Sequence, residues 1–103
     1  SYLQSFRTLK QEFTYRANLA QTDTVAELRK WVQGLNAEMD EVLAAFTDTD
    51  IEGKLVDRGG WSVPVGINFH IYREALLIFY GKASVYLKAM NKPFTEQWRT
   101  WIA

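Results

Sequence analysis

The 103-residue sequence contains no cysteine, only one histidine and only two prolines. The absence of cysteine excludes disulfides, thiolate catalysis and zinc–cysteine sites from this chain. Neither Ser62 nor Ser84 has a histidine at a suggestive place, which disfavours a catalytic triad. The Gly59-Gly60 pair lacks the spacing and the lysine–serine ending of a phosphate-binding loop.

An excess of charge of one sign is also missing. Twelve basic and twelve acidic residues cancel, and they alternate along the chain without blocks. A nucleic-acid or anionic-membrane surface requires a basic stripe, so we expect neither partner. No apolar run is long enough to span a membrane, because Arg73, Glu74, Lys82 and Lys88 interrupt the most apolar segment. We find no signal peptide and expect a cytoplasmic protein, although the chain opens at Ser1 without a methionine and upstream residues are therefore expected.

The composition that is present favours one folded domain over residues 1–103. Hydrophobic residues make up 48% and aromatic residues 15%, which argues against disorder. A chain of this size buries roughly 60–70% of its unfolded surface, so one modest core is expected. Aromatic residues at helical spacing are typical of such a core, and a ligand cavity lined by them is the alternative.

The segment 68–92 is predicted to be the central helix. Two adjacent apolar rows predict that most of its circumference is covered. They are Tyr72, Leu76, Phe79, Ala83, Tyr86 and Met90, and Ile67, Ile71, Ala75, Ile78, Val85 and Ala89. Pro64 and Gly66 set its start, and Asn91 followed by Pro93 sets its end.

Two further long helices are predicted before it. Residues 1–20 carry an apolar face with Leu3, Phe6, Leu9 and Phe13. Residues 25–46 follow a Thr24–Glu27 capping box. Their apolar positions are separated by 3, 4, 3, 4, 3 and 4 residues: Val25, Leu28, Val32, Leu35, Met39, Val42 and Phe46. That seam is typical of an antiparallel bundle or a coiled coil, with Gly34 as a place of close helix approach.

The connection over residues 51–65 differs in kind. Its glycines and its apolar alternation predict an extended excursion or short hairpin that turns at residues 57–60 and lies against the bundle through Trp61. The preceding residues 47–50 are expected to end the second helix. After Pro93, Thr95 is expected to cap a short amphipathic turn that carries Trp98, Trp101 and Ile102.

The segment Phe79-Tyr80-Gly81-Lys82, followed by Tyr86-Leu87-Lys88-Ala89-Met90-Asn91-Lys92-Pro93, resembles the last bundle helix of the DinB-like (damage-inducible) superfamily. The upstream Gly-Gly-Trp-Ser-Val-Pro-Val loop resembles the extended connection before that helix. The resemblance implies an all-α, up-down four-helix bundle. This chain would form the C-terminal part of a longer domain, with three long helices and the hairpin excursion.

The resemblance also implies where a metal would be expected. Family members often bind a divalent metal such as Zn or Ni through His-x-x-x-His, and those two positions fall on Ala75 and Phe79 here, which cannot ligate. Members with an intact site are metal-dependent transferases and isomerases. We therefore expect no metal cofactor and no catalytic residue at the family positions.

His70 and Glu74 are the candidate ligand-binding residues. Four residues apart on a helix, they lie on one face about 6 Å apart, a spacing that helical metal sites use. The alternative is a local polar pair. Glu38, Asp40 and Glu41 fall outside the apolar seam and are expected to be ordinary solvated carboxylates.

The sequence thus predicts a non-catalytic binding or structural module that has lost the family metal site and forms a homodimer, because the central helix has apolar residues on nearly every side. A small-molecule sensor differs only by an unknown ligand. The alternative is a metal-dependent transferase or hydrolase that uses His70, Glu74 and a ligand from a segment upstream of Ser1.

Overall fold

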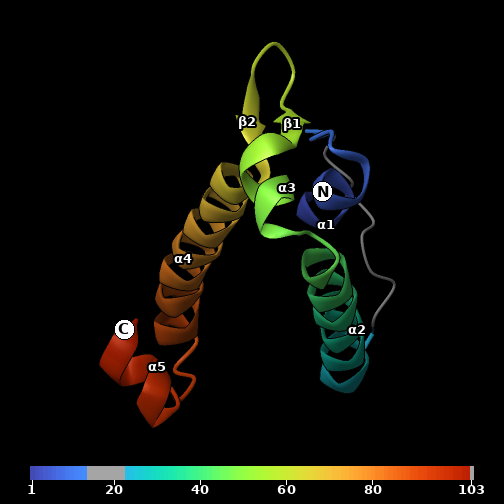
Figure 1. Cartoon of the computed structure of the whole chain (residues 1–103). Helices are drawn as coiled ribbons and strands as arrows, with labels where there is room; N and C mark the ends of the chain where they lie inside the picture. Colours follow the sequence, from blue (N-terminus) through green and yellow to red (C-terminus); the bar gives the residue numbers. More distant parts are fainter. Residues whose placement is uncertain (14–22, 103) are drawn as a thin grey trace. The chain divides into compact units, whose positions relative to one another are not determined.

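The computed structural model describes residues 1–13 and 23–102, and it is mostly helical with one small sheet (Figure 1). In chain order the elements are α1 (Tyr2–Thr8), α2 (Val25–Ala44), α3 (Asp48–Gly53), β1 (Leu55–Asp57), β2 (Ser62–Pro64), α4 (Val65–Ala89) and α5 (Glu96–Trp101). The predicted all-α class is confirmed at this level. The chain divides into two compact units, Ser1–Asn68 and Phe69–Ala103.

The first unit is built on the contact of α1 with α2. Phe6 is 2% exposed, and its ring meets that of Phe46 edge-on at a centroid distance of 6.4 Å. Arg7 forms a 2.7 Å ion pair with Glu38 on α2. Met39, also buried, completes this side of the core. The apolar period of residues 25–46 therefore predicted both the helix and its packing face.

The prediction of a long first helix is wrong for the described residues. Helix α1 ends at Thr8, and Leu9 adopts a left-handed conformation with φ 56°. The next residues pair with β1: the Asp57 amide donates to the Leu9 carbonyl at 2.9 Å, and the Gln11 amide donates to the Asp57 carbonyl at 2.7 Å. Backbone pairing beside the sheet has replaced the helical hydrogen bonds that the apolar period favoured. The rest of the predicted helix, residues 14–20, lies outside the described residues.

The hairpin prediction is confirmed, but its contact with the rest of the unit is different. Strands β1 and β2 pair antiparallel with Val56 opposite Val63, around a turn in which Gly59 and Gly60 have φ 79° and 100°. Val56 is fully buried and Val63 nearly so, whereas Trp61 is 55% exposed. The alternation of a strand puts the valines inward, so the prediction that Trp61 anchors the hairpin is wrong.

Residues 47–53 were also predicted wrongly as the end of one helix and the start of an extended segment. Thr47 and Asp50 form a second capping box, in which the Asp50 amide donates to the Thr47 hydroxyl at 3.1 Å and the Thr47 amide donates to the Asp50 carboxylate at 3.1 Å. The box begins the short helix α3. Threonine and aspartate favour helix starts and turns alike, which is why the pattern allowed both interpretations.

The second unit consists of most of α4 together with α5. Helix α4 ends at Ala89, Asn91 takes φ 53° as predicted, and Thr95 caps α5 by accepting from the Trp98 amide at 3.2 Å. Within this unit α5 packs beside the end of α4 (Figure 1), because the Trp98 indole donates to the Ser84 hydroxyl at 2.8 Å. Its ring also meets Tyr80 edge-on, at 5.4 Å between centroids.

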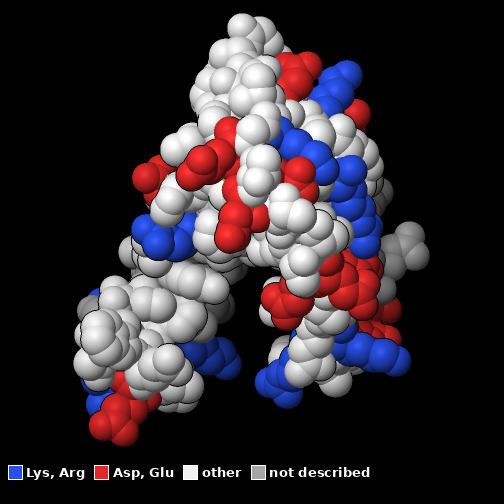
Figure 2. All heavy atoms as spheres, in the orientation of Figure 1, with Lys and Arg blue, Asp and Glu red and all other residues white. Residues whose placement is uncertain are grey.

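Two predictions about partners concern the molecular surface. No helix in residues 1–13 and 23–102 is long and apolar enough to cross a membrane. On the face drawn in Figure 2, Lys and Arg side chains adjoin one another in a run at the upper right, and acidic side chains lie on both sides of this run. Of the three long helices expected, α2 with 20 residues and α4 with 25 are the two present among the described residues.

The cap of α2 predicts how its stability depends on pH. The Glu27 carboxylate accepts from the Thr24 hydroxyl and amide, both at 3.0 Å, and from the Asp23 amide at 3.1 Å. These bonds, that of the Thr24 hydroxyl first, lower the pKa of Glu27 below its ordinary value of 4.5. A lowered folded-state pKa gives stability that is present above the unfolded value and is lost as pH falls through the folded value.

We therefore expect the free energy of unfolding of Glu27→Gln to depend less steeply on pH below 4.5 than that of the native chain. Denaturant titrations followed by circular dichroism at a series of acidic pH values measure this. Glu41→Gln, at an exposed carboxylate of the same helix that takes no part in the cap, is the control and should keep the native slope. Equal slopes for all three proteins would contradict the assignment.

Candidate binding surface

The apolar seam of α2 is buried at one end and exposed at the other. Met39 is 9% exposed in the half that α1 covers. In the half nearer the capping box, Val25, Leu28 and Val32 are 71%, 44% and 41% exposed. The helical period that creates this face is the same throughout, so the difference comes from α1, which covers only one half. The exposed half is an apolar surface without a cover among the described residues.

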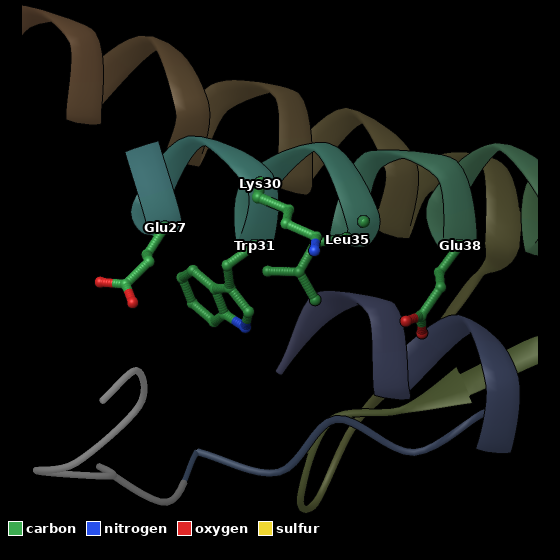
Figure 3. Close-up of a pocket in the computed structure, with 6 residues that line it drawn as sticks. Glu27, Lys30, Trp31, Leu35 and Glu38 are labelled. Atoms are coloured by element: carbon green, nitrogen blue, oxygen red, sulfur yellow. The ribbon is translucent and has the colours of Figure 1, made fainter. Parts of the chain in front are cut away.

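A hollow of about 380 Å³ lies beside this exposed half. It is lined by Glu27, Lys30, Trp31, Gly34, Leu35 and Glu38. Figure 3 shows Trp31 and Leu35 projecting on the same side of α2, between Glu27 and Glu38. Gly34 contributes no side chain, which leaves the helix backbone accessible between the larger neighbours. We call the set formed by Leu28, Val32 and these six lining residues the α2 surface.

The chemistry of the α2 surface suits binding. The Glu27 carboxylate is engaged by the helix cap, and Glu38 is held by Arg7. A general acid and base need free carboxyl groups within reach of one substrate. The accessible groups are instead the indole of Trp31, the Leu35 side chain and the Lys30 ammonium. An apolar centre with charges at its rim is typical of a protein-binding face.

The predicted ligand pair lies elsewhere, on the part of α4 that belongs to the second unit. His70 and Glu74 are both exposed, as expected for one helix face. Within residues 1–13 and 23–102, no group of three or more His, Cys, Asp or Glu side chains could hold a metal ion. The family positions Ala75 and Phe79 fall on the same helix, and Phe79 is 60% exposed. The structure therefore supplies no third ligand from the described residues.

One polar cluster was missed by sequence reasoning. Arg58 is only 6% exposed, although it follows directly after β1 in the hairpin turn. Its Nη1 donates to Asn68 Oδ1 at 2.6 Å, and Asn68 Nδ2 donates to the Ser5 hydroxyl at 3.0 Å. An arginine in a glycine-rich turn is typical of a solvated position, so the sequence contained no signal for this burial.

Comparisons of the chain with protein-family models, with curated proteins and with solved structures gave no match. The DinB-like resemblance, the absence of the family metal and the pair His70–Glu74 therefore stay predictions. The α2 surface is the structural feature from which we propose a function below.

Gly34 provides a test of the exposed half of α2. A Cβ atom added at Gly34 has no heavy atom within 4 Å, so Gly34→Ala loses no packing and gains helix propensity. We expect the free energy of unfolding to rise by about 0.5–1 kcal/mol under conditions where the chain is monomeric. Denaturant titration measures the change.

The matched control is Gly66→Ala in the first turn of α4. There the new Cβ would lie 2.9 Å from Ile51 Cγ2, so a neighbour must move. We expect the gain in propensity to be lost and the variant to be no more stable than the native chain. Destabilisation by Gly34→Ala under the same conditions would show that the face is already covered in the monomer.

Proposed function

We propose that this chain is a non-catalytic binding or structural module of the DinB-like type, cytoplasmic, without the family metal site, that acts as a homodimer. The observation that carries the proposal is the exposed apolar half of α2, where Leu28, Trp31 and Val32 are 44%, 37% and 41% exposed. Exposed apolar side chains gathered on one face mark an interaction surface.

A second copy of the chain suits this surface in shape and charge. Two α2 helices that pack antiparallel through their exposed apolar halves would cover Val25, Leu28 and Val32 of both copies. The chain has no net charge, so two copies do not repel each other at long range.

The element order supports the finer fold proposal of an up-down four-helix bundle. The described residues contain two long helices, α2 and α4, so two copies would supply four. The hairpin of β1 and β2 directly before α4 agrees with the extended connection that the resemblance implies. In such an assembly the apolar seam of α2 would become part of a core.

The dimer is tested by sedimentation equilibrium of the 103-residue chain and of Val32→Lys. A lysine at position 32 replaces a valine that the dimer would bury, a loss of about 1.5–3 kcal/mol, and we expect the dissociation constant to rise by at least about 10-fold. Ala37→Lys, exposed and outside the seam on the same helix, is the control and should leave association unchanged. A stable monomer for the native chain at all accessible concentrations would remove the dimer.

The alternative function, a metal-dependent transferase or hydrolase using His70 and Glu74, is tested by titration calorimetry with nickel and zinc. Two ligands on one helix form a weak site, and we expect neither the native chain nor His70→Ala to bind stoichiometrically. Stoichiometric binding by the native chain that His70→Ala abolishes would support the enzyme.

A further inference from the structure

The second unit has an exposed apolar face on α4 with a lysine at its centre. Lys82 has apolar residues at all four positions that lie three and four residues away, and these positions share its side of the helix. They are Ile78, Phe79, Val85 and Tyr86, which are between 59% and 69% exposed. Helix α5 leaves this face open, because it contacts Tyr80 and Ser84, two residues from Lys82 and therefore on the other side of α4. We call these five residues the α4 face.

The two units have opposite net charges, although the whole chain is neutral. Residues 1–68 include ten acidic and seven basic residues, a net charge of −3, and residues 69–103 include two acidic and five basic residues, a net charge of +3. Lys82 forms no ion pair with the described residues. Opposite charges on two surfaces attract and determine which faces meet. The α4 face is therefore complementary in charge to the first unit.

The hollow beside α2 is the part of the first unit that suits the α4 face. Two of its six lining residues are acidic and one is basic, so its net charge is −1. Trp31 and Leu35 project on one side of α2, between Glu27 and Glu38 (Figure 3). Gly34 keeps the centre open, since a Cβ added there would meet no heavy atom within 4 Å. An apolar face with one cation thus matches an apolar hollow with carboxylates at its ends.

We propose that the α4 face docks on the α2 surface of a second copy, with the Lys82 ammonium in the hollow between the carboxylates of Glu27 and Glu38. This inference rests on the proposed homodimer and assigns the helix of the second copy that covers the hollow. Glu27 accepts bonds from the helix cap, and Glu38 accepts one from Arg7. A carboxylate has about four acceptor sites, so both groups can also accept from an ammonium.

The docking covers the part of the α2 surface that a second α2 helix leaves open. Leu28 and Val32 form one row of apolar side chains on α2, and Trp31 and Leu35 form the next row. In a four-helix bundle each helix packs beside two others, so α2 of the second copy covers the first row and its α4 covers the second. Aromatic side chains bury about 150–250 Å² each. The α4 faces of two copies therefore supply a large part of the about 1,200–2,000 Å² that a stable interface buries.

Cross-linking of single-cysteine variants tests the contact, because the native chain contains no cysteine. Gly34→Cys in the hollow and Val85→Cys on the α4 face are mixed in equal amounts and treated with a short bismaleimide. We expect a product that joins one chain of each variant, identified by its mass, because this link forms only between α2 of one copy and α4 of another. Asn36→Cys, exposed on the opposite side of α2 from Gly34, should not give this product with Val85→Cys.

Sedimentation equilibrium tests the role of charge. Lys82→Glu places a third carboxylate in the hollow, and we expect the dissociation constant to rise by at least about 10-fold. Lys92→Glu, which changes the net charge equally but lies beyond the end of α4, should raise it far less. The dissociation constant of the native chain should also rise with salt, which screens the attraction between the oppositely charged units.

The outcomes separate this docking from the homodimer itself. A native dimer that gives no mixed cross-link, or that Lys82→Glu leaves intact, would overturn the docking of α4 and keep the homodimer. A native chain that stays monomeric would remove both. The double variant Gly34→Cys with Val85→Cys decides between copies: a link within a single chain would show that the chain's own α4 covers the hollow, and would exclude the second copy as its occupant.

Discussion

The buried amide of Asn68 is the interaction on which the first unit depends. Asn68 is fully buried at the start of α4, accepts from Arg58 after β1 and donates to Ser5 on α1. Three elements far apart in the sequence are thereby fixed by one side chain. Loss of the amide would leave the guanidinium and the hydroxyl unsatisfied, at a cost of about 1–3 kcal/mol for each buried group. The position of the hairpin relative to α1 therefore depends on a polar contact.

The apolar core around this amide is small, which connects stability with assembly. The buried hydrophobic residues of the described chain are Phe6, Met39, Val56, Val63 and Val65. The seam of α2 continues past this core into solvent, so part of the hydrophobic free energy available to the helix is not used in one chain. A partner that binds only the folded chain stabilises it by mass action. Association that buries the exposed half of α2 would therefore stabilise the folded chain.

Local patterns predicted what local forces determine. The capping boxes, the seam of α2, the hairpin and the left-handed Asn91 each depend on residues within a few positions of one another, and all except the start of α3 were assigned correctly. The first helix failed because Leu3, Phe6 and Leu9 have helical spacing, yet residues 9–11 pair with β1, nearly fifty positions away. Periodicity contains no information about a partner at that separation. The prediction that Trp61 is buried failed because it rested on hydrophobicity alone, which favoured Trp61 over the smaller valines.

The burial of Arg58 was missed, and the end of the first helix was predicted wrongly, for the same reason. Had residues 9–13 remained helical, Gln11 would not lie beside Arg58 and Phe13 would not cover the guanidinium. The left-handed Leu9 redirects the chain, the backbone pairing with Asp57 brings Gln11 into register, and only then does a turn arginine become buried. His70 and Glu74, by contrast, are related by helical spacing alone, and that spacing brings no third group to them. Sequence spacing therefore identified His70 and Glu74, which a single helix brings together. It could not identify the buried cluster of Arg58, Asn68 and Ser5, because that cluster depends on contacts between three segments.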